Sequence, residues 1–183
     1  MVYDESMRRV LAAVIVLLAV MLGIGEALAA DASEIPRFPN LTLLSVDGST
    51  RIDIDSLRGR PVLLTFWASW CGPCRMELPE LQKLAAELKD QGLALVTVNM
   101  DQSPAMGMKF LERNGINVPV FLMSSSDLRA LGVGSLPTNV LLDRDGRPAQ
   151  IFEGYSPEVP AEIRRLVLGM KVGPPAAGKP TVK

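Results

Sequence analysis

The only two cysteines of this 183-residue chain, Cys71 and Cys74, are separated by Gly72 and Pro73. A pair with this spacing could perform dithiol–disulfide chemistry, form a structural disulfide or bind a metal. Zinc requires about four ligands, usually cysteine or histidine, and the sequence has no histidine and no third cysteine. A structural disulfide here would close a loop of about four residues, for which the entropic stabilisation is smallest. Redox chemistry is therefore favoured.

A Cu(I) site is the alternative that stays open. Two thiolates bind Cu(I) well, and Met100, Met106 and Met108 lie in one segment that could supply thioether ligands. Methionine more often fills gaps in protein cores, however. The alternative function is thus a Cu(I)-binding metallochaperone module without redox turnover.

The segments on either side of the cysteines predict how they are positioned. Residues 61–67 are mostly branched and aromatic, as in a buried strand. Residues 72–90 repeat leucine every three or four positions, which predicts an amphipathic helix. Cys71 then lies at a helix start, where unpaired N–H groups and the helix dipole favour a thiolate. We predict Cys71 as the nucleophile and Cys74, one turn further on, as the resolving thiol.

The remaining pattern predicts an α/β fold with a central mixed sheet, helices on both faces and an added N-terminal β-hairpin. A helix joins the strands at 62–67 and 93–99, so these strands should be parallel neighbours, whereas the closing hairpin should be antiparallel. The other expected elements are hairpins at 41–54 and 138–152, an extended piece at 120–123, a turn of helix at 127–131, and helices at 104–113 and 157–168.

The N-terminal residues 1–29 predict a signal peptide or an N-terminal membrane anchor. Arg8 and Arg9 precede an uncharged apolar stretch and the small-x-small triplet at 27–29. The apolar stretch is near the lower limit of about 17 residues for a membrane span, so both interpretations stay open. Each places the rest of the chain outside the cytoplasm, in the periplasm or on the outer face of the cytoplasmic membrane.

Residues 36–170 have the length of one ordinary domain, and residues 171–183 are rich in proline and poor in apolar residues, which predicts a disordered tail. The formal net charge of −1 and pI of about 5.6 give no reason to expect a nucleic-acid partner. We also expect no cofactor and no metal beyond the Cu(I) alternative.

Three motifs resemble the thioredoxin-fold thiol-disulfide oxidoreductases of the TlpA/ResA type. They are residues 67–74, the Glu-Leu-Pro at 77–79, and the stretch 134–146, and the resemblance covers roughly residues 36–170. It implies a thioredoxin-like fold in which Pro137 is a cis proline facing the cysteines and Leu136 offers backbone groups to an extended substrate. We also expect Trp70, Gly72 and Pro73, next to Cys71, to belong to the substrate-docking surface, although Trp70 could equally be a partly buried packing residue.

Glu77 follows Cys74 by three residues and therefore shares its helical face. The resemblance implies that Glu77 accepts the proton of the buried thiol, whereas the alternative is a solvated acidic residue in the first helical turns. Thioredoxin has a buried aspartate on the preceding strand, and the matching residue here, Thr65, cannot act as a carboxylate. This difference from thioredoxin favours Glu77 for the proton-transfer role.

The resemblance implies a reductase of protein disulfides, because the Gly72-Pro73 pair is that of reducing thioredoxins. A reductase in an oxidising compartment needs electrons from elsewhere, and the resemblance implies a transmembrane thiol carrier as the donor. The expected substrates are the paired cysteines of apocytochrome c or of copper-site assembly proteins, between which the sequence does not choose.

Overall fold

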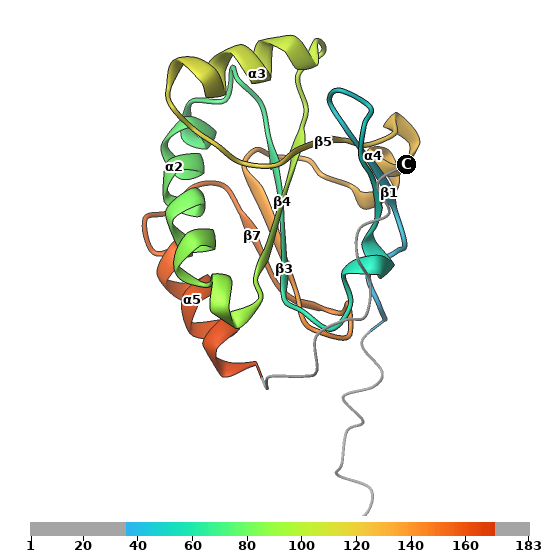
Figure 1. Ribbon diagram of the computed structural model, residues 1–183, viewed down its shortest axis with the longest axis vertical. Helices are drawn as coiled ribbons and strands as arrows, with labels where there is room; N and C mark the ends of the chain where they lie inside the picture. The colour runs from blue at the N-terminus through green and yellow to red at the C-terminus, as the bar shows by residue number, and fades with distance from the viewer. Residues whose placement is uncertain (1–35, 171–183) are drawn as a thin grey trace, which may run out of the picture. The chain divides into compact units, whose positions relative to one another are not determined.

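The computed structural model describes residues 36–170, which form a seven-stranded sheet with the order β2-β1-β5-β4-β3-β6-β7 (Figure 1). The predicted signal peptide or anchor and the predicted tail lie outside the described residues. The strands are β1 (Thr42–Ser45), β2 (Arg51–Asp53), β3 (Val62–Trp67), β4 (Ala94–Asn99), β5 (Val120–Leu122), β6 (Thr138–Leu142) and β7 (Pro148–Glu153). The helices are α2 (Gly72–Glu87), α3 (Pro104–Arg113), α4 (Ser125–Leu131) and α5 (Val159–Gly169), with short 3₁₀ helices η2 (Ile54–Leu57) and η3 (Lys89–Gln91).

The sheet is mixed, and β3 is at its centre. β3 runs parallel to β4 on one side and antiparallel to β6 on the other. β4 and β5 are also parallel, whereas β6 and β7 form an antiparallel hairpin. The predicted parallel pair and the predicted closing hairpin are therefore confirmed. At the other end of the sheet, β1 pairs antiparallel with both β2 and β5.

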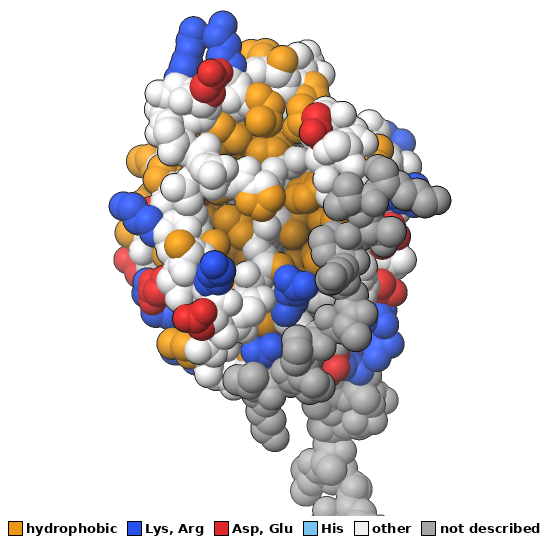
Figure 2. Space-filling model, viewed as in Figure 1, with side chains coloured by type: hydrophobic (Ala, Val, Ile, Leu, Met, Phe, Trp, Pro, Cys, Tyr) orange, Lys and Arg blue, Asp and Glu red, His pale blue; other side chains and the backbone are white. Residues whose placement is uncertain are grey.

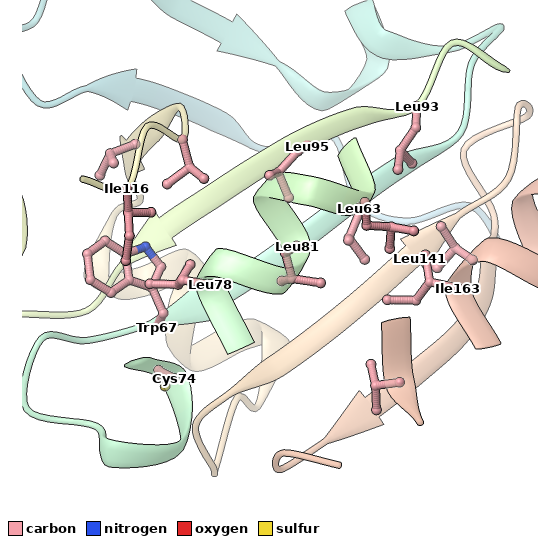
Figure 3. Close-up of a cluster of buried hydrophobic side chains, with 14 of the residues drawn as sticks. Leu63, Trp67, Cys74, Leu78, Leu81, Leu93, Leu95, Ile116, Leu141 and Ile163 are labelled. Atoms are coloured by element: carbon pink, nitrogen blue, oxygen red, sulfur yellow. The ribbon is translucent and has the colours of Figure 1, made fainter. Parts of the chain in front are cut away.

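Helices cover both faces of the sheet, as predicted. The side chains of β3 alternate between two buried clusters, so Leu63 and Trp67 face one side while Leu64 and Phe66 face the other. The first cluster is completed by α2, α3 and α5, and Figure 3 shows Cys74 at one end of it. Apolar residues from η2 and α4 pack against the second cluster.

Helix α2 connects the central strand to the redox pair. Cys71 is its N-cap, Pro73 occupies one of the first helical positions, and Pro79 lies inside the helix. The segment predicted as helix to residue 90 is α-helical only to Glu87 and then continues as η3. Gly92 ends η3 with a φ of 79°, in the left-handed region. Glycine adopts this conformation without a steric penalty, which lets the chain turn toward the next strand.

No helix in the 36–170 region is long and apolar enough to cross a membrane.

Candidate active site

Cys71 and Cys74 form a disulfide whose sulfur atoms are 2.06 Å apart. The turn after β3, residues 68–70, leads directly to Cys71, which is the N-cap of α2. The prediction that Cys71 lies at the start of the helix is therefore confirmed. The backbone N–H of Cys74 points at Cys71 Sγ with a nitrogen–sulfur distance of 3.2 Å. Cys71 is 5% exposed and Cys74 is fully buried. Only Cys71 is therefore accessible to another molecule, and its sulfur lies at the positive end of a helix.

The loop before Cys71 is held by a buried carboxylate. Asp101 Oδ2 accepts the backbone N–H of Ser69 at 3.0 Å, and Asp101 Oδ1 accepts the Ser69 hydroxyl at 2.8 Å. Asn99 Nδ2 donates to Asp101 Oδ2 at 2.8 Å. From the other side, Arg75 Nε donates to the carbonyl oxygen of Ser69 at 2.8 Å. Both polar backbone groups of Ser69 are thus fixed directly next to the redox pair.

Helix α3 approaches this network through Gly107, which is buried. A Cβ atom at this position would lie 2.4 Å from Asn99 Nδ2 and 2.9 Å from Asp101 Oδ2. Such contacts are too short for a side chain to fit without movement of the network. The sequence analysis did not identify this cluster. The signal available was that Asn99 ends β4 and Asp101 follows it. Because β4 runs parallel to β3, the carboxyl ends of the two strands, and with them these residues and the cysteines, lie at the same edge of the sheet.

Glu77 lies on the buried face of α2 and belongs to a second polar cluster. Asn139 Nδ2 donates to Glu77 Oε1 at 2.8 Å, and Thr65 Oγ1 donates to Asn139 Oδ1 at 2.8 Å. All three residues have no exposed surface. The structure therefore excludes the solvated alternative for Glu77. It also shows that Thr65, although not a carboxylate, takes part in the cluster through Asn139, which the sequence analysis missed.

Burial raises the pKa of Glu77 to about 7, because the charged carboxylate loses its hydration. The hydrogen bond from Asn139 acts in the opposite direction and lowers the pKa, while the nearby charge of Glu80 raises it further. Glu77 Oε2 is buried and has no hydrogen-bond partner among residues 36–170. A protonated carboxyl is easier to bury in this way than a carboxylate, so Glu77 can gain or lose a proton near neutral pH.

The other residues predicted for the site differ in exposure. Gly72 and Pro73 are exposed, and Trp70 is 63% exposed, so the packing interpretation of Trp70 is wrong. The Leu136–Pro137 peptide bond is cis, as the resemblance implies. Pro137 is buried, and half-buried Leu136 packs against the cluster that contains both cysteines.

The methionines of the Cu(I) alternative differ in their surroundings. Met100 is half-buried and packs against both apolar clusters, whereas Met106 and Met108 are exposed on α3. Among the described residues, no group of three or more histidine, cysteine and acidic side chains could hold a metal ion.

Comparisons with known proteins agree with this geometry. The family model for Redoxin matches residues 33–166. Thiol-disulfide oxidoreductase ResA of Bacillus subtilis is 34% identical over 121 residues, which are 66% of this chain and 67% of ResA.

Two solved structures share the fold. One is a putative thiol:disulfide interchange protein DsbE from Chlorobium tepidum, with a TM-score of 0.65 and 31% identity over 72% of this chain and 93% of that one. The other is StoA from Bacillus subtilis, with a TM-score of 0.59 and 27% identity over 71% and 98% of the two chains. The chain belongs to the Redoxin family, and it is a thiol-disulfide oxidoreductase of the TlpA/ResA type with a thioredoxin-like fold.

Proposed function

We propose that this oxidoreductase reduces protein disulfides outside the cytoplasmic membrane. The observation that carries the proposal is the arrangement along α2, where an accessible sulfur at the helix N-terminus is followed by a buried sulfur and a buried carboxyl. In the reduced protein, the N–H of Cys74 and the helix dipole stabilise the thiolate of Cys71. Cys71 is therefore the nucleophile.

The first step forms a mixed disulfide. The Cys71 thiolate attacks one sulfur of the substrate disulfide, the substrate S–S bond breaks, and the other substrate sulfur leaves as a thiolate that takes a proton from water. The second step needs the thiolate of Cys74, which then attacks Cys71 Sγ. The second substrate sulfur leaves, the Cys71–Cys74 disulfide forms, and two electrons have passed to the substrate.

Glu77 supplies the base for the second step. Cys74 is fully buried, so its thiol has no direct access to bulk water as a proton acceptor. Glu77 follows one turn later on the same helical face and has a pKa of about 7 in the oxidised protein. A base whose pKa is close to the working pH combines a useful ionised fraction with adequate strength. Asn139, itself held by Thr65, fixes the orientation of the Glu77 carboxyl.

The exposed residues around Cys71 form the docking surface for the substrate. Trp70, Gly72 and Pro73 lie in the exposed part of the loop and first helical turn. The backbone of half-buried Leu136 completes the surface, where an extended substrate segment can pair with the chain, and the buried cis Pro137 orients this backbone. Trp70 contributes the largest apolar side chain of this surface.

The proposed location rests on the sequence of residues 1–29, and the proposed partners rest on the family resemblance. The basic and apolar pattern of residues 1–29 supports export or anchoring, with the redox domain outside the membrane. A transmembrane thiol carrier then returns two electrons to the Cys71–Cys74 disulfide. The proposed substrates are the paired cysteines of apocytochrome c or of copper-site assembly proteins.

A trapping experiment tests the proposal. The Cys74→Ser variant of the full chain can form the mixed disulfide but cannot resolve it, so it should accumulate covalent adducts with exported proteins that contain paired cysteines. The Cys71→Ser variant is the matched control and should give no adducts. Absence of adducts together with tight stoichiometric Cu(I) binding by the wild type would contradict the reductase and support the metallochaperone.

A further inference from the structure

A cleft of about 620 Å³ opens between the first half of α2 and helix α3, beside the redox pair. Ser69 and Arg75 line it, and these residues lie on either side of Cys71 and Cys74 in the sequence. The N–H of Arg75 bonds to the carbonyl oxygen of Cys71 at 3.3 Å, so Arg75 lies one helical turn from the nucleophile. The cleft does not include the residues that the proposed docking surface uses.

Three cationic side chains line the cleft: Arg75 from α2, and Lys109 and Arg113 from α3. None of its lining residues is acidic. Glu112 is exposed on α3 but is not part of the lining. Because the whole chain has a net charge of −1, this group of cations is a local feature. Figure 2 shows Lys and Arg side chains at the end of the molecule that carries α3, with an acidic side chain beside them.

The charges of these three side chains are not neutralised by ion pairs within the described residues. Within residues 36–170, no acidic side chain forms an ion pair with Arg75, Lys109 or Arg113. Arg75 Nε is bonded to the carbonyl of Ser69, and its guanidinium carbon lies 5.5 Å from the centre of the Phe110 ring. These contacts fix the plane of the guanidinium and leave its two terminal nitrogens without a hydrogen-bond partner among the described residues. A fixed guanidinium is well suited to a carboxylate.

The rest of the cleft is partly apolar. Pro79 and Ile116 line it together with Phe110, and the exposed side chain of Met106 lies at its α3 wall. Lys109 and Arg113 are four residues apart on α3 and therefore share one helical face. The cleft thus offers apolar contacts between charges of one sign, which suits a peptide that carries acidic and apolar side chains.

We propose that this cleft binds an acidic segment of the protein substrate, close in sequence to the cysteine that Cys71 attacks. The inference rests on the proposed reductase function, because it assigns the cleft to the same substrate. An extended peptide advances about 3.3 Å per residue, and one helical turn is about 5.4 Å. A carboxylate about two to four residues from the attacked cysteine can therefore reach Arg75, and further acidic residues can reach Lys109 and Arg113.

Two synthetic peptides with the same disulfide test this assignment, one with glutamate and one with lysine at the flanking positions. For the reduced wild type, we expect kcat/KM to be at least 10-fold higher for the glutamate peptide at low salt, and the preference to shrink as salt screens the charges. The double variant Lys109→Glu/Arg113→Glu should lose or invert the preference. Its rate with a small uncharged disulfide should equal that of the wild type.

The matched control is Lys83→Glu/Arg129→Glu, which makes the same change in net charge at two exposed residues outside the cleft. It should retain the preference for the glutamate peptide. Equal rates of the wild type with both peptides, or an equal loss of preference in the control, would overturn the cleft assignment while leaving the reductase intact. A wild type that reduces neither peptide nor the small disulfide would overturn both proposals.

Discussion

Asn139 Nδ2 donates a hydrogen bond to Glu77 Oε1 at 2.8 Å, and this bond joins the centre of the sheet to the helix that carries the redox pair. The two residues are 62 positions apart in the sequence. Asn139 is held in turn by Thr65 on the adjacent strand, with which it is paired in register. The carboxyl group is therefore positioned by the rigid sheet, although it belongs to the helix.

The raised pKa of Glu77 predicts how stability depends on pH in the oxidised protein. The folded pKa of about 7 lies above the ordinary value of 4.5, so the folded state binds more protons between these values. The associated stabilisation is complete below pH 4.5 and is lost as pH rises through 7, by about 3 kcal/mol. Urea unfolding of wild type and Glu77→Gln should show this difference. A pH-independent difference between the two would contradict it.

Glu77→Gln should slow the resolution of the mixed disulfide by about 100-fold near pH 7, because glutamine cannot accept the thiol proton. The initial attack by Cys71 should change little. Rapid-mixing measurements of both steps with a disulfide peptide separate the two effects. The matched control is Glu80→Gln, which removes the neighbouring acidic group of α2. Equal slowing in both variants would show that Glu77 has no special role in resolution.

Asn139→Ala removes the hydrogen bond that lowers the pKa of Glu77, so this pKa should rise further. The pH at which resolution reaches half its maximal rate should rise with it. The variant should also lose about 1–3 kcal/mol of unfolding free energy, because it leaves buried groups of Glu77 and Thr65 without partners. Denaturant unfolding and the pH profile of resolution test both effects. An unchanged pH profile would show that Asn139 has only a structural role.

Gly107→Ala should disturb the loop before Cys71 without a direct change to the redox pair. The added Cβ would lie 2.4 Å from Asn99 Nδ2, so the side chains that hold Ser69 must move. We expect a loss of about 1–3 kcal/mol in stability and a changed alkylation rate of reduced Cys71. Met108→Ala, at the exposed neighbouring position, should leave the alkylation rate unchanged. If Gly107→Ala also leaves it unchanged, the network does not position Cys71.

Local sequence patterns predicted the elements that carry the cysteines, because strand and helix periodicity and the helix start depend on neighbouring residues. The central strand and the start of α2 agree with the structure. The cis bond before Pro137 also agrees, but it was implied by the family resemblance and not by the local pattern. The end of α2 differs from the prediction of a helix to residue 90, because the last turn of that segment is a 3₁₀ helix.

The polar partners of the site could not be predicted in the same way. Asp101 reaches Ser69 across 32 positions of sequence, and Asn139 reaches Thr65 across 74. These contacts depend on which strands become neighbours and in which register, and no local pattern contains that information. The burial of Glu77 is likewise a property of the assembled sheet and helices, although its helical face was evident from its spacing to Cys74.

The redox pair follows the central strand β3, which has neighbours on both sides and no exposed residue. Thiol–disulfide exchange needs the three sulfur atoms to come nearly into line, and the hydrogen bonds of Ser69 to Asp101 and Arg75 restrain the loop that carries the attacking sulfur. The substrate must therefore adapt its own backbone. For the proposed reductase, this geometry favours disulfides in incompletely folded chains over those already fixed in mature proteins.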